Sequence, residues 1–553
     1  MNASPSEEDA GLSSPVRASR LKHAVSWGLV VAIPVFAALY SPISLLSTNI
    51  EDVSPSDSIR AIVLIGGLAF VLLISLRLLL GNLEKASLLA TLAILLILSY
   101  GHIYNLLKPV TFGTLAIGRH RILLPLALAI LIVLGALIWR SPPPGRRLLG
   151  YMSFIGLTLL LWAAYPLAIH NLETERVATL GEGSRGVLLE PSADPRPDIY
   201  YIILDGHGRG DVLEFTFGYD SQGLSEELEA LGFYIADESL ANYGWTALSI
   251  ASSLNMSYLD ELAQVIGESG TDIGPARDMI RNNEVTEIMK SAGYTIVSYD
   301  SGAQEGIANN DIYLVPDFSE TIEQYAILRG LSLNPFEGML LETTMGRVPY
   351  EWFVNEQRNA RALITDFNYE KQRQRILFQL STLPEFAEVE GDYFIFAHVM
   401  SPHPPFIFGP RGEEVPNSGV FSLEDLGCCE IEEYRSRYRD QTSYLDKLLV
   451  QAVRDIVEAS DIPPIIIVQG DHGPSLNMDE GDSTSRGRFE RMAILNAYLL
   501  PESCRDQLYP EISPVNSFRV VLNCLGTEVE MVPDRSYYSG YWSPYDFIQV
   551  ENP

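Results

Sequence analysis

The chain begins with long apolar runs that short polar stretches separate. Five of these runs come close to the roughly 20 residues that an α-helix needs to cross the hydrocarbon core of a bilayer. They lie at about Val25–Leu46, Ala61–Leu80, Ala86–Leu107, Ile122–Trp139 and Leu148–Ile169. We therefore expect an α-helical membrane anchor of about five spans within residues 23–170.

Beyond a linker over residues 171–197, the apolar runs become short and alternate with amphipathic segments. Continuous β-branched and aromatic residues predict buried strands at Ile199–Leu204, Tyr393–Val399 and Ile465–Gln469. An amphipathic helix is expected around Ser436–Glu458. Alternation of this kind predicts an α/β domain over residues 198–553, with a mostly parallel central sheet and helices on both faces.

Charge separates the same two parts. The formal net charge is −32, but Met1–His170 holds 12 Lys and Arg against 7 Asp and Glu, whereas the remainder holds 26 against 63. The acidic part argues against nucleic acid as a partner, because phosphate contacts need Lys and Arg. It is compatible with binding of a divalent cation. Nothing in the sequence indicates an oligomeric state.

The basic residues between the apolar runs predict the orientation in the membrane. With a cytoplasmic tail at residues 1–22, eight Lys and Arg fall on the cytoplasmic side and four on the other side, as the positive-inside rule favours. Five spans then place everything after residue 170 outside the cytoplasm. In an oxidising compartment Cys504 and Cys524 could pair, whereas Cys428 and Cys429 stay ambiguous.

Acidic residues directly follow two of the expected strands. Asp205 comes after the first strand, and Asp471 and His472 follow the last one beyond Gly470. Strand ends of an open α/β sheet meet at the crevice where such folds bind ligands. Two carboxylates and an imidazole there form a donor set for a divalent metal. The alternative for Asp471 and His472 is a hydrogen-bonded pair in a loop without chemistry.

An alcohol and further histidines and arginines complete the candidate residues. Thr246 follows a turn and could open a helix, where N–H groups and the helix dipole suit a phosphate, although a simple N-cap is the alternative. His403 lies after the expected strand Tyr393–Val399, and His398 lies inside that strand as either a core or a site residue. Arg486, Arg488 and Arg491 could clamp a phosphate or belong to a solvated loop. His207, close to Asp205, could support the metal-binding residues, but a solvated loop residue is the expected role.

The ordered set Asp205-Gly206, Thr246, Ser401–Phe406 and Asp471–Gly473 resembles the alkaline phosphatase superfamily. More closely, it is similar to the sulfatase-like membrane transferases typified by lipoteichoic acid synthases and phosphoethanolamine transferases. The resemblance implies that Asp205, Thr246, Asp471 and His472 bind the metal and that Thr246 is the nucleophile. It also implies that His403 contacts the substrate phosphate or the leaving group, with His398, Arg486 and Arg488 as further substrate-binding candidates.

Differences from these families refine the expectation. Lipoteichoic acid synthases have Glu where this chain has Asp205, and two-metal members carry another histidine after the Asp-His pair, which this chain lacks. One divalent ion is therefore expected, Mn or Mg before Zn, since carboxylate-rich sites suit harder ions. The resemblance implies transfer of a phospho-substituent, of phosphoglycerol or phosphoethanolamine type, from a lipid donor to an envelope lipid or glycan through a phosphothreonine intermediate. The alternatives are a phosphodiesterase, phosphonate or sulfate ester hydrolase, and a non-catalytic membrane sensor.

Overall fold

The structure is a computed structural model. It describes the chain apart from residues 1–14, 50–54, 109, 113–114, 179–188, 190–195, 320–334, 350, 352–359, 417–428, 477–483, 541–542 and 553. Much of the expected cytoplasmic tail, most of the expected linker and Cys428 therefore lie outside the described residues. The chain forms two compact units, one of Met1–Asn171 with Ser332–Ala360 and one of Leu172–Leu331 with Arg361–Pro553.

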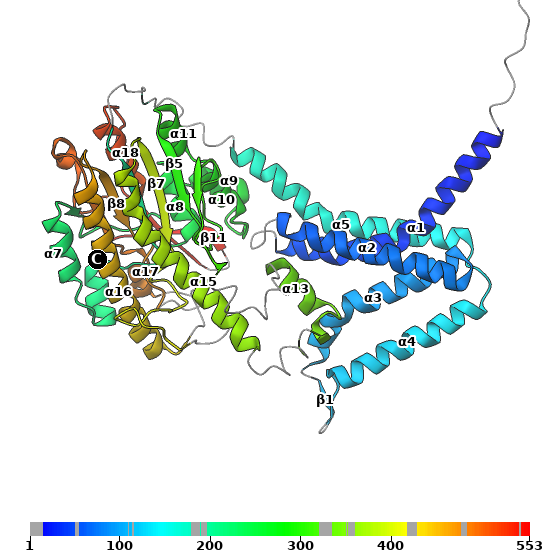
Figure 1. The fold of residues 1–553 in the computed structure, drawn as a ribbon. Coiled ribbons are helices and arrows are strands. Elements are labelled where there is room, and N and C mark those ends of the chain that lie inside the picture. The colour runs from blue at the N-terminus through cyan, green and yellow to red at the C-terminus, as the bar shows by residue number, and fades with distance from the viewer. Residues whose placement is uncertain are drawn as a thin grey trace, which may run out of the picture. The chain divides into compact units, whose positions relative to one another are not determined.

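The first unit is built on five long helices, each of which contains a stretch long and apolar enough to cross a membrane. They are α1 (Pro15–Thr48), α2 (Pro55–Leu80), α3 (Leu83–Leu107), α4 (His120–Arg140) and α5 (Arg146–Ala178), with a short hairpin of β1 (Thr111–Phe112) and β2 (Leu115–Ala116) before α4. Within this unit α3 is the most buried span and α4 the least. The five expected spans are confirmed (Figure 1).

The first unit also takes in Ser332–Ala360, which the sequence-based division assigns to the catalytic domain. Within this stretch α13 (Pro335–Thr343) packs on the membrane helices, where Phe336 and Leu340 join an apolar cluster. Gly101 of α3 permits the approach, because a Cβ there would meet the Glu342 carbonyl oxygen at 2.2 Å. The boundary differs from the expected one because the apolar face of α13 packs on the membrane helices. The position of α13 along the sequence could not reveal this packing.

The second unit is organised around a seven-stranded sheet of order β4-β9-β8-β3-β7-β5-β6. The strands are β3 (Ile199–Leu204), β4 (Tyr234–Ile235), β5 (Thr295–Tyr299), β6 (Ile312–Leu314), β7 (Tyr393–Val399), β8 (Ile465–Gln469) and β9 (Asn496–Leu499). Neighbouring strands are parallel except for β9, which runs antiparallel to both β8 and β4. The expected mostly parallel sheet is confirmed.

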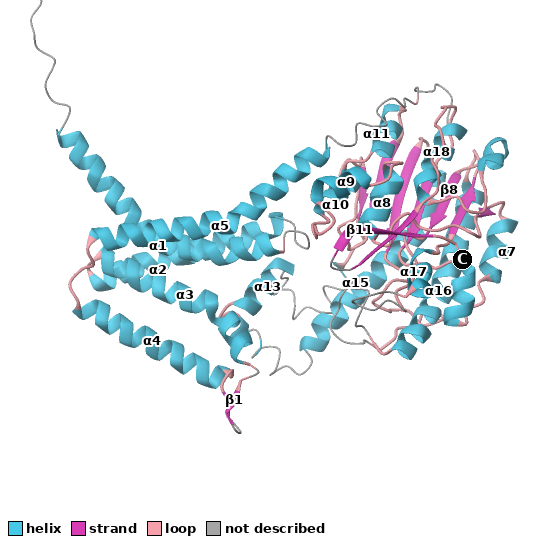
Figure 2. Cartoon of the chain, turned by 180° about the vertical axis from the view of Figure 1, so that it is seen from behind, coloured by secondary structure: helices cyan, strands magenta, loops and turns pink. Residues whose placement is uncertain are grey.

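Helices cover both faces of this sheet (Figures 1 and 2). One face packs against α8 (Thr246–Leu254), α9 (Asp260–Ile266), α10 (Gly274–Arg281), α11 (Glu284–Ser291) and α18 (Pro514–Cys524), and the other against α7 (Gln222–Ala230), α15 (Ala360–Thr382) and α16 (Ile431–Ala459). Alternate residues of β3 enter the two cores, Tyr201 and Ile203 on the α8 side and Tyr200 and Ile202 on the α16 side. Burial on both sides explains why the strand is apolar throughout.

Shorter elements complete the unit. They are α6 (Gly210–Val212), a π-helical turn (Leu213–Phe217), 3₁₀ turns at Leu383–Glu388 and Glu502–Gln507, α17 (Ser485–Met492), and the hairpin of β10 (Ser536–Gly540) and β11 (Ser543–Val550). Cys504 and Cys524 form a disulfide, with their Cα atoms 5.6 Å apart. The pairing that the sequence left open is therefore present for these two residues.

Asp198 lies directly before β3, where its side chain accepts a hydrogen bond from Tyr393 N–H at 2.8 Å. Burial raises the pKa of this carboxyl to about 6, with the Tyr393 hydrogen bond opposing the rise and the Asp392 charge adding to it. A carboxyl whose pKa rises on folding contributes stability below its unfolded pKa, and this stability is lost as the pH rises through the folded pKa. Ionised Asp198 therefore destabilises the fold at neutral pH.

We expect Asp198→Asn to raise the free energy of unfolding at neutral pH by about 1 kcal/mol, a value discounted for the exposed part of the carboxyl. The gain should shrink near pH 5. Thermal unfolding of the detergent-solubilised full chain at both pH values measures it. Asp311→Asn is a control of opposite sign, because a hydrogen bond from Ile296 N–H lowers the pKa of Asp311. An Asp198→Asn effect that is independent of pH would contradict the expectation.

Candidate metal and phosphoryl-transfer site

Sheet register brings the candidate carboxylates together. β3 and β8 are parallel neighbours with Ile203 opposite Gln469, so Asp205 and Asp471 emerge side by side at the carboxyl ends of the two strands. A hydrogen bond from Gly206 N–H to Asp471 Oδ1, 3.0 Å long, ties the two turns to each other. Asp205, Asp471 and His472 are all buried, and one ligand atom from each lies within 4.8 Å of the others.

Two glycines allow the Asp-His pair to sit at this crowded edge. A Cβ on Gly470 would meet the His207 carbonyl oxygen at 2.5 Å, and one on Gly473 would meet the Glu490 carbonyl oxygen at 2.1 Å. No side chain fits either position without moving the backbone. The glycines on both sides of Asp471 and His472 are thus required by close packing around the pair.

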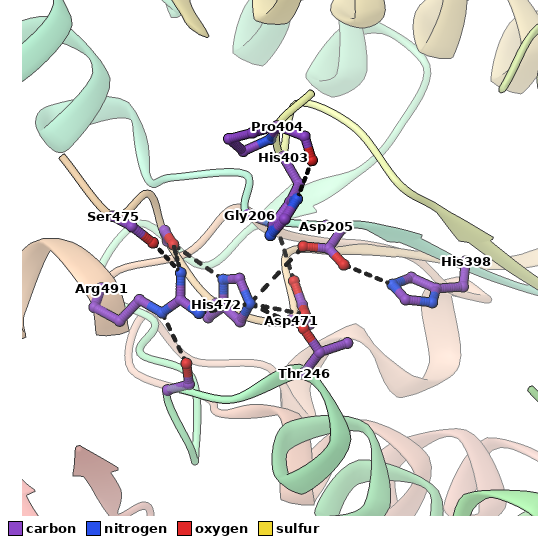
Figure 3. A network of polar contacts seen from close by, with 12 residues as sticks. Asp205, Gly206, Thr246, His398, His403, Pro404, Asp471, His472, Ser475 and Arg491 are labelled. Atoms are coloured by element: carbon purple, nitrogen blue, oxygen red, sulfur yellow. Dashed lines mark hydrogen bonds and ion pairs between the residues drawn. The ribbon is translucent and has the colours of Figure 1, made fainter. Parts of the chain in front are cut away.

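The ring of His472 has a defined tautomer. Its Nδ1 lies 3.0 Å from the Gly473 carbonyl oxygen, which can only accept, so Nδ1 carries the proton and Nε2 offers a lone pair. Around Nε2 lie Thr246 Oγ1 at 3.0 Å, Asp471 Oδ2 at 3.3 Å and Asp205 Oδ1 at 3.8 Å. Figure 3 shows these four side chains converging from three separate segments.

Two oxygens of this cluster lack a hydrogen-bond donor in the described part of the chain. They are Asp205 Oδ1 and Asp471 Oδ2, both buried and both turned toward His472 Nε2. Buried acceptors without a donor are rare and call for an explanation such as an ion. With the lone pair of Nε2 they form an oxygen-rich donor set, so the residues present fit a divalent cation.

Thr246 is the first residue of α8, and the N-cap is Trp245, so the alternative of Thr246 as an N-cap does not apply. Thr246 is half-buried, whereas the metal-ligand candidates are almost fully buried. Its hydroxyl therefore belongs to a side chain that is less buried than the metal-ligand candidates, at the positive end of a helix. An alcohol in this position can approach both a buried cation and an incoming anionic ester.

His398 contacts the cluster from the neighbouring strand β7. Its Nε2 lies 3.0 Å from Asp205 Oδ2, which leaves Oδ1 of that carboxylate turned toward His472. Burial favours the neutral form of Asp205, but His403, His398 and His472 together lower its pKa to about 2. Burial alone would lower the pKa of the His398 ring, but the hydrogen bond to Asp205 and its charge outweigh burial and raise that pKa. Both shifts keep Asp205 ionised.

His403 lies above the cluster in the segment after β7. Its backbone N–H donates to the Asp205 carbonyl oxygen at 2.9 Å, and its ring centre lies 6.4 Å from that of His472. The ring Nδ1 donates to the Pro404 carbonyl oxygen at 2.5 Å, which turns Nε2 away from its own backbone. The structure therefore brings His403 beside Asp205 and the Asp-His pair, across the cluster from Thr246 (Figure 3).

Arg491 of α17 is the arginine that the structure places in the cluster. It is 3% exposed, and its Nη2 lies 3.0 Å from His472 Nε2. Its other donors bind the Gly244 carbonyl oxygen at 2.7 Å, the Gly473 carbonyl oxygen and the Ser475 hydroxyl. A buried guanidinium that two loops hold in this way brings a fixed positive charge to the site.

The other arginines of α17 lie elsewhere. Arg486 donates to Glu490 and stacks on Phe215, and Arg488 lies over the ring of Tyr538. Sequence spacing could not choose among the three arginines, because the choice depends on which face of α17 packs against the strand ends. His207 is fully buried with Nε2 2.9 Å from Asp446, so its expected place in a solvated loop was wrong.

The fold and the site define a class of α/β proteins in which carboxylates, an imidazole and an alcohol meet at the ends of parallel strands. Within this class, the model of the sulfatase family matches residues 199–501, more than half of the chain. The chain belongs to the sulfatase family. The family-level resemblance expected from the sequence is thereby confirmed, and the matched stretch contains every residue of the cluster.

Solved structures similar to this chain include three of interest. The C-terminal periplasmic domain of EcEptC from Escherichia coli in complex with Zn is 10% identical, with 66% of this chain and 96% of that chain covered and a TM-score of 0.39. The integral membrane lipooligosaccharide phosphoethanolamine transferase A from Neisseria meningitidis is 11% identical, with 90% and 95% covered and a TM-score of 0.37. The phosphonate monoester hydrolase of Agrobacterium radiobacter is 14% identical, with 62% and 80% covered and a TM-score of 0.38. No curated protein matches the chain.

Proposed function

We propose that this protein is a metal-dependent transferase of the cell envelope. It moves a phospho-substituent of phosphoglycerol or phosphoethanolamine type from a lipid donor to an envelope lipid or glycan, through a phosphothreonine at Thr246. The observation that carries the proposal is the Thr246 hydroxyl, 3.0 Å from His472 Nε2 and beside two buried carboxylate oxygens that lack a donor. A hydroxyl in this setting is suited to act as a nucleophile.

The chain's own residues account for the two transfer steps. Thr246 Oγ1, after losing its hydroxyl proton to solvent, forms a bond to phosphorus while the ester bond to the donor alcohol breaks, and a proton from His403 Nε2 can neutralise the leaving oxygen. The acceptor hydroxyl then attacks the phosphorus, the Thr246 ester breaks, and His403 takes up the acceptor's proton. The N–H groups at the start of α8 and the positive charge of Arg491 would offset negative charge on the transferred group.

Asp205, Asp471 and His472 would hold the metal, with the Thr246 oxygen beside it. A bound divalent ion supplies Lewis acidity that lowers the pKa of the threonine alcohol and offsets charge on the phosphoryl oxygens. Two carboxylates and an alcohol among four donors favour Mn or Mg over Zn.

Attachment to a membrane supports a lipid substrate. The first unit has five helices able to span a bilayer, and the distribution of basic residues favours a domain outside the cytoplasm. The disulfide between Cys504 and Cys524 suits an oxidising compartment. A site fixed to a bilayer meets lipid headgroups without leaving the surface, so the substrate concentration that it experiences is high.

The proposal is tested with the detergent-solubilised full chain, loaded with Mn²⁺ and mixed with vesicles of phosphatidylethanolamine or phosphatidylglycerol. Mass spectrometry of the quenched protein should find phosphoethanolamine or phosphoglycerol on the peptide that contains Thr246. Product analysis with an added alcohol should find a new phosphodiester. Release of the free phospho-alcohol alone would instead identify a hydrolase, and lipid turnover without any adduct at Thr246 would contradict the intermediate.

A further inference from the structure

The segment Ser513–Arg519 at the start of α18 has no role in the chemistry described so far, yet it is almost entirely buried. Several of its contacts reach α8 and the residues that flank it. They are made to Asn242 in the loop before α8, to Ser253 within α8 and to Met256, two residues after its end. Because Thr246 is the first residue of α8, this segment holds the helix that carries the proposed nucleophile.

The contact in front of α8 is made by Asn242, which is fully buried four residues before Thr246. Its Oδ1 accepts from Val515 N–H at 2.7 Å, and its Nδ2 donates to Ser513 Oγ and to the Arg535 carbonyl oxygen, both at 2.9 Å. Its backbone carbonyl accepts from Tyr537 N–H at 2.9 Å. All four bonds tie the loop before α8 to later parts of the chain.

The contact after the end of α8 is made by Arg519, which lies on α18. Its Nη2 donates to the Met256 carbonyl oxygen at 2.6 Å. The backbone of Met256 has a φ of +50°, a conformation that residues other than glycine seldom adopt. Between the two ends, Ser253 Oγ lies 3.3 Å from the Pro514 carbonyl oxygen. The helix is thus held before its first turn, along its length and after its last turn.

The segment is itself anchored. Asp534 Oδ1 accepts hydrogen bonds from the backbone and hydroxyl of Ser513 and from Asn516 Nδ2. Asn516 also exchanges two hydrogen bonds with Val532. A segment anchored by charge-assisted bonds can transmit a fixed position to α8 rather than move with it.

We infer that Ser513–Arg519 with Asn242 is a positioning clamp for the nucleophile, in which Asn242 and Arg519 are positioning residues for Thr246. The inference rests on the proposed function, because it assigns the clamp to the attack by Thr246. Misplacement of a reacting group by about 1 Å can cost a hundredfold in rate. The clamp keeps Thr246 Oγ1 within 3.0 Å of His472 Nε2 although the two residues come from different segments.

The test compares two isosteric substitutions in the Mn²⁺-loaded full chain, with bis(p-nitrophenyl) phosphate as the probe. Asn242→Asp keeps the acceptor for Val515 and removes both donors. Asn523→Asp is the matched control at the other end of α18, where the amide donates to the Val529 carbonyl and accepts from Val529 N–H but does not contact α8. We expect kcat to fall by about 10- to 100-fold in Asn242→Asp, with KM within about threefold and metal content unchanged. Asn523→Asp should lower only the melting temperature.

A second pair covers the case in which Asn242→Asp fails to fold. Arg519→Met removes the bond to Met256 and should lower kcat about tenfold, and Arg519→Lys, which keeps one donor, should restore much of it. Unchanged kcat in the Asn242 and Arg519 variants, with melting temperatures lowered as in Asn523→Asp, would overturn the inference and leave only a structural role. The outcome is separate from that of the proposed function, which the adduct at Thr246 decides.

Discussion

Thr246→Ala should reduce turnover of a phosphodiester by at least about 10³-fold, because it removes the hydroxyl that we propose as the nucleophile. The substitution leaves the first turn of α8 intact, since the N-cap is Trp245 and the Thr246 side chain does not cap the helix. Thr246→Ser retains a hydroxyl and should stay within about tenfold of the natural protein. Initial rates with bis(p-nitrophenyl) phosphate in the Mn²⁺-loaded full chain measure the effect.

Ser252→Ala is the control for changes in α8 that are unrelated to chemistry. Ser252 lies in the same helix, and its hydroxyl donates to the Ser257 carbonyl oxygen at 2.7 Å, away from the cluster. We expect it to alter the melting temperature slightly and the rate by less than about threefold. Substantial turnover in Thr246→Ala, at equal metal content, would end the assignment of Thr246 as nucleophile.

Asp471→Asn should change the stability of the metal-free and metal-loaded protein in opposite directions. Without metal, Asp471 Oδ2 is a buried charged oxygen without a donor, 3.3 Å from the lone pair of His472 Nε2. An amide nitrogen at that position can donate to Nε2 while the other oxygen still accepts from Gly206 N–H. The metal-free protein should therefore gain about 1–3 kcal/mol in its free energy of unfolding.

With metal present, the natural protein should be more stable than Asp471→Asn. Binding at a hundredfold excess over Kd stabilises the natural protein by about 2.7 kcal/mol, and the variant should lose most of this gain. Thermal unfolding of the full chain, chelated or titrated with Mn²⁺, measures both effects. Asp446→Asn is the matched control, because both oxygens of that buried carboxylate already have donors in His207 and Tyr219. It should destabilise the protein equally with and without metal, and a similar response of Asp471→Asn would argue against a metal site.

Local patterns predicted much of the architecture. Each spanning helix is encoded by a run of apolar residues whose length the bilayer sets, so five spans could be counted without knowing how they pack. The buried strands could be recognised for a similar reason, since Tyr200 and Tyr201 alternate between two cores that both require apolar side chains. Because helices cover both faces of β3, the strand has no solvent-facing position. Its unbroken apolar run identified it in the sequence.

Other features depend on contacts between distant segments. The packing of Phe336 on the membrane helices was not visible in the sequence, because a short amphipathic helix has the same pattern in either unit. Nor could spacing show that Arg491, rather than Arg486 or Arg488, reaches His472. The burial of His207 depends in the same way on Asp446, which lies 239 positions away in the chain.

By itself the sequence predicted which residues meet in one cluster, because Asp205, Asp471 and His472 follow strand patterns and strand ends share one edge of a sheet. Only the tertiary structure decided how close they come and which atoms lack a donor. Those properties depend on the parallel register of β3 and β8 and on the packing of α8 and α17 against their ends. A distance between side chains results from the packing of many segments at once, and no local pattern contains it.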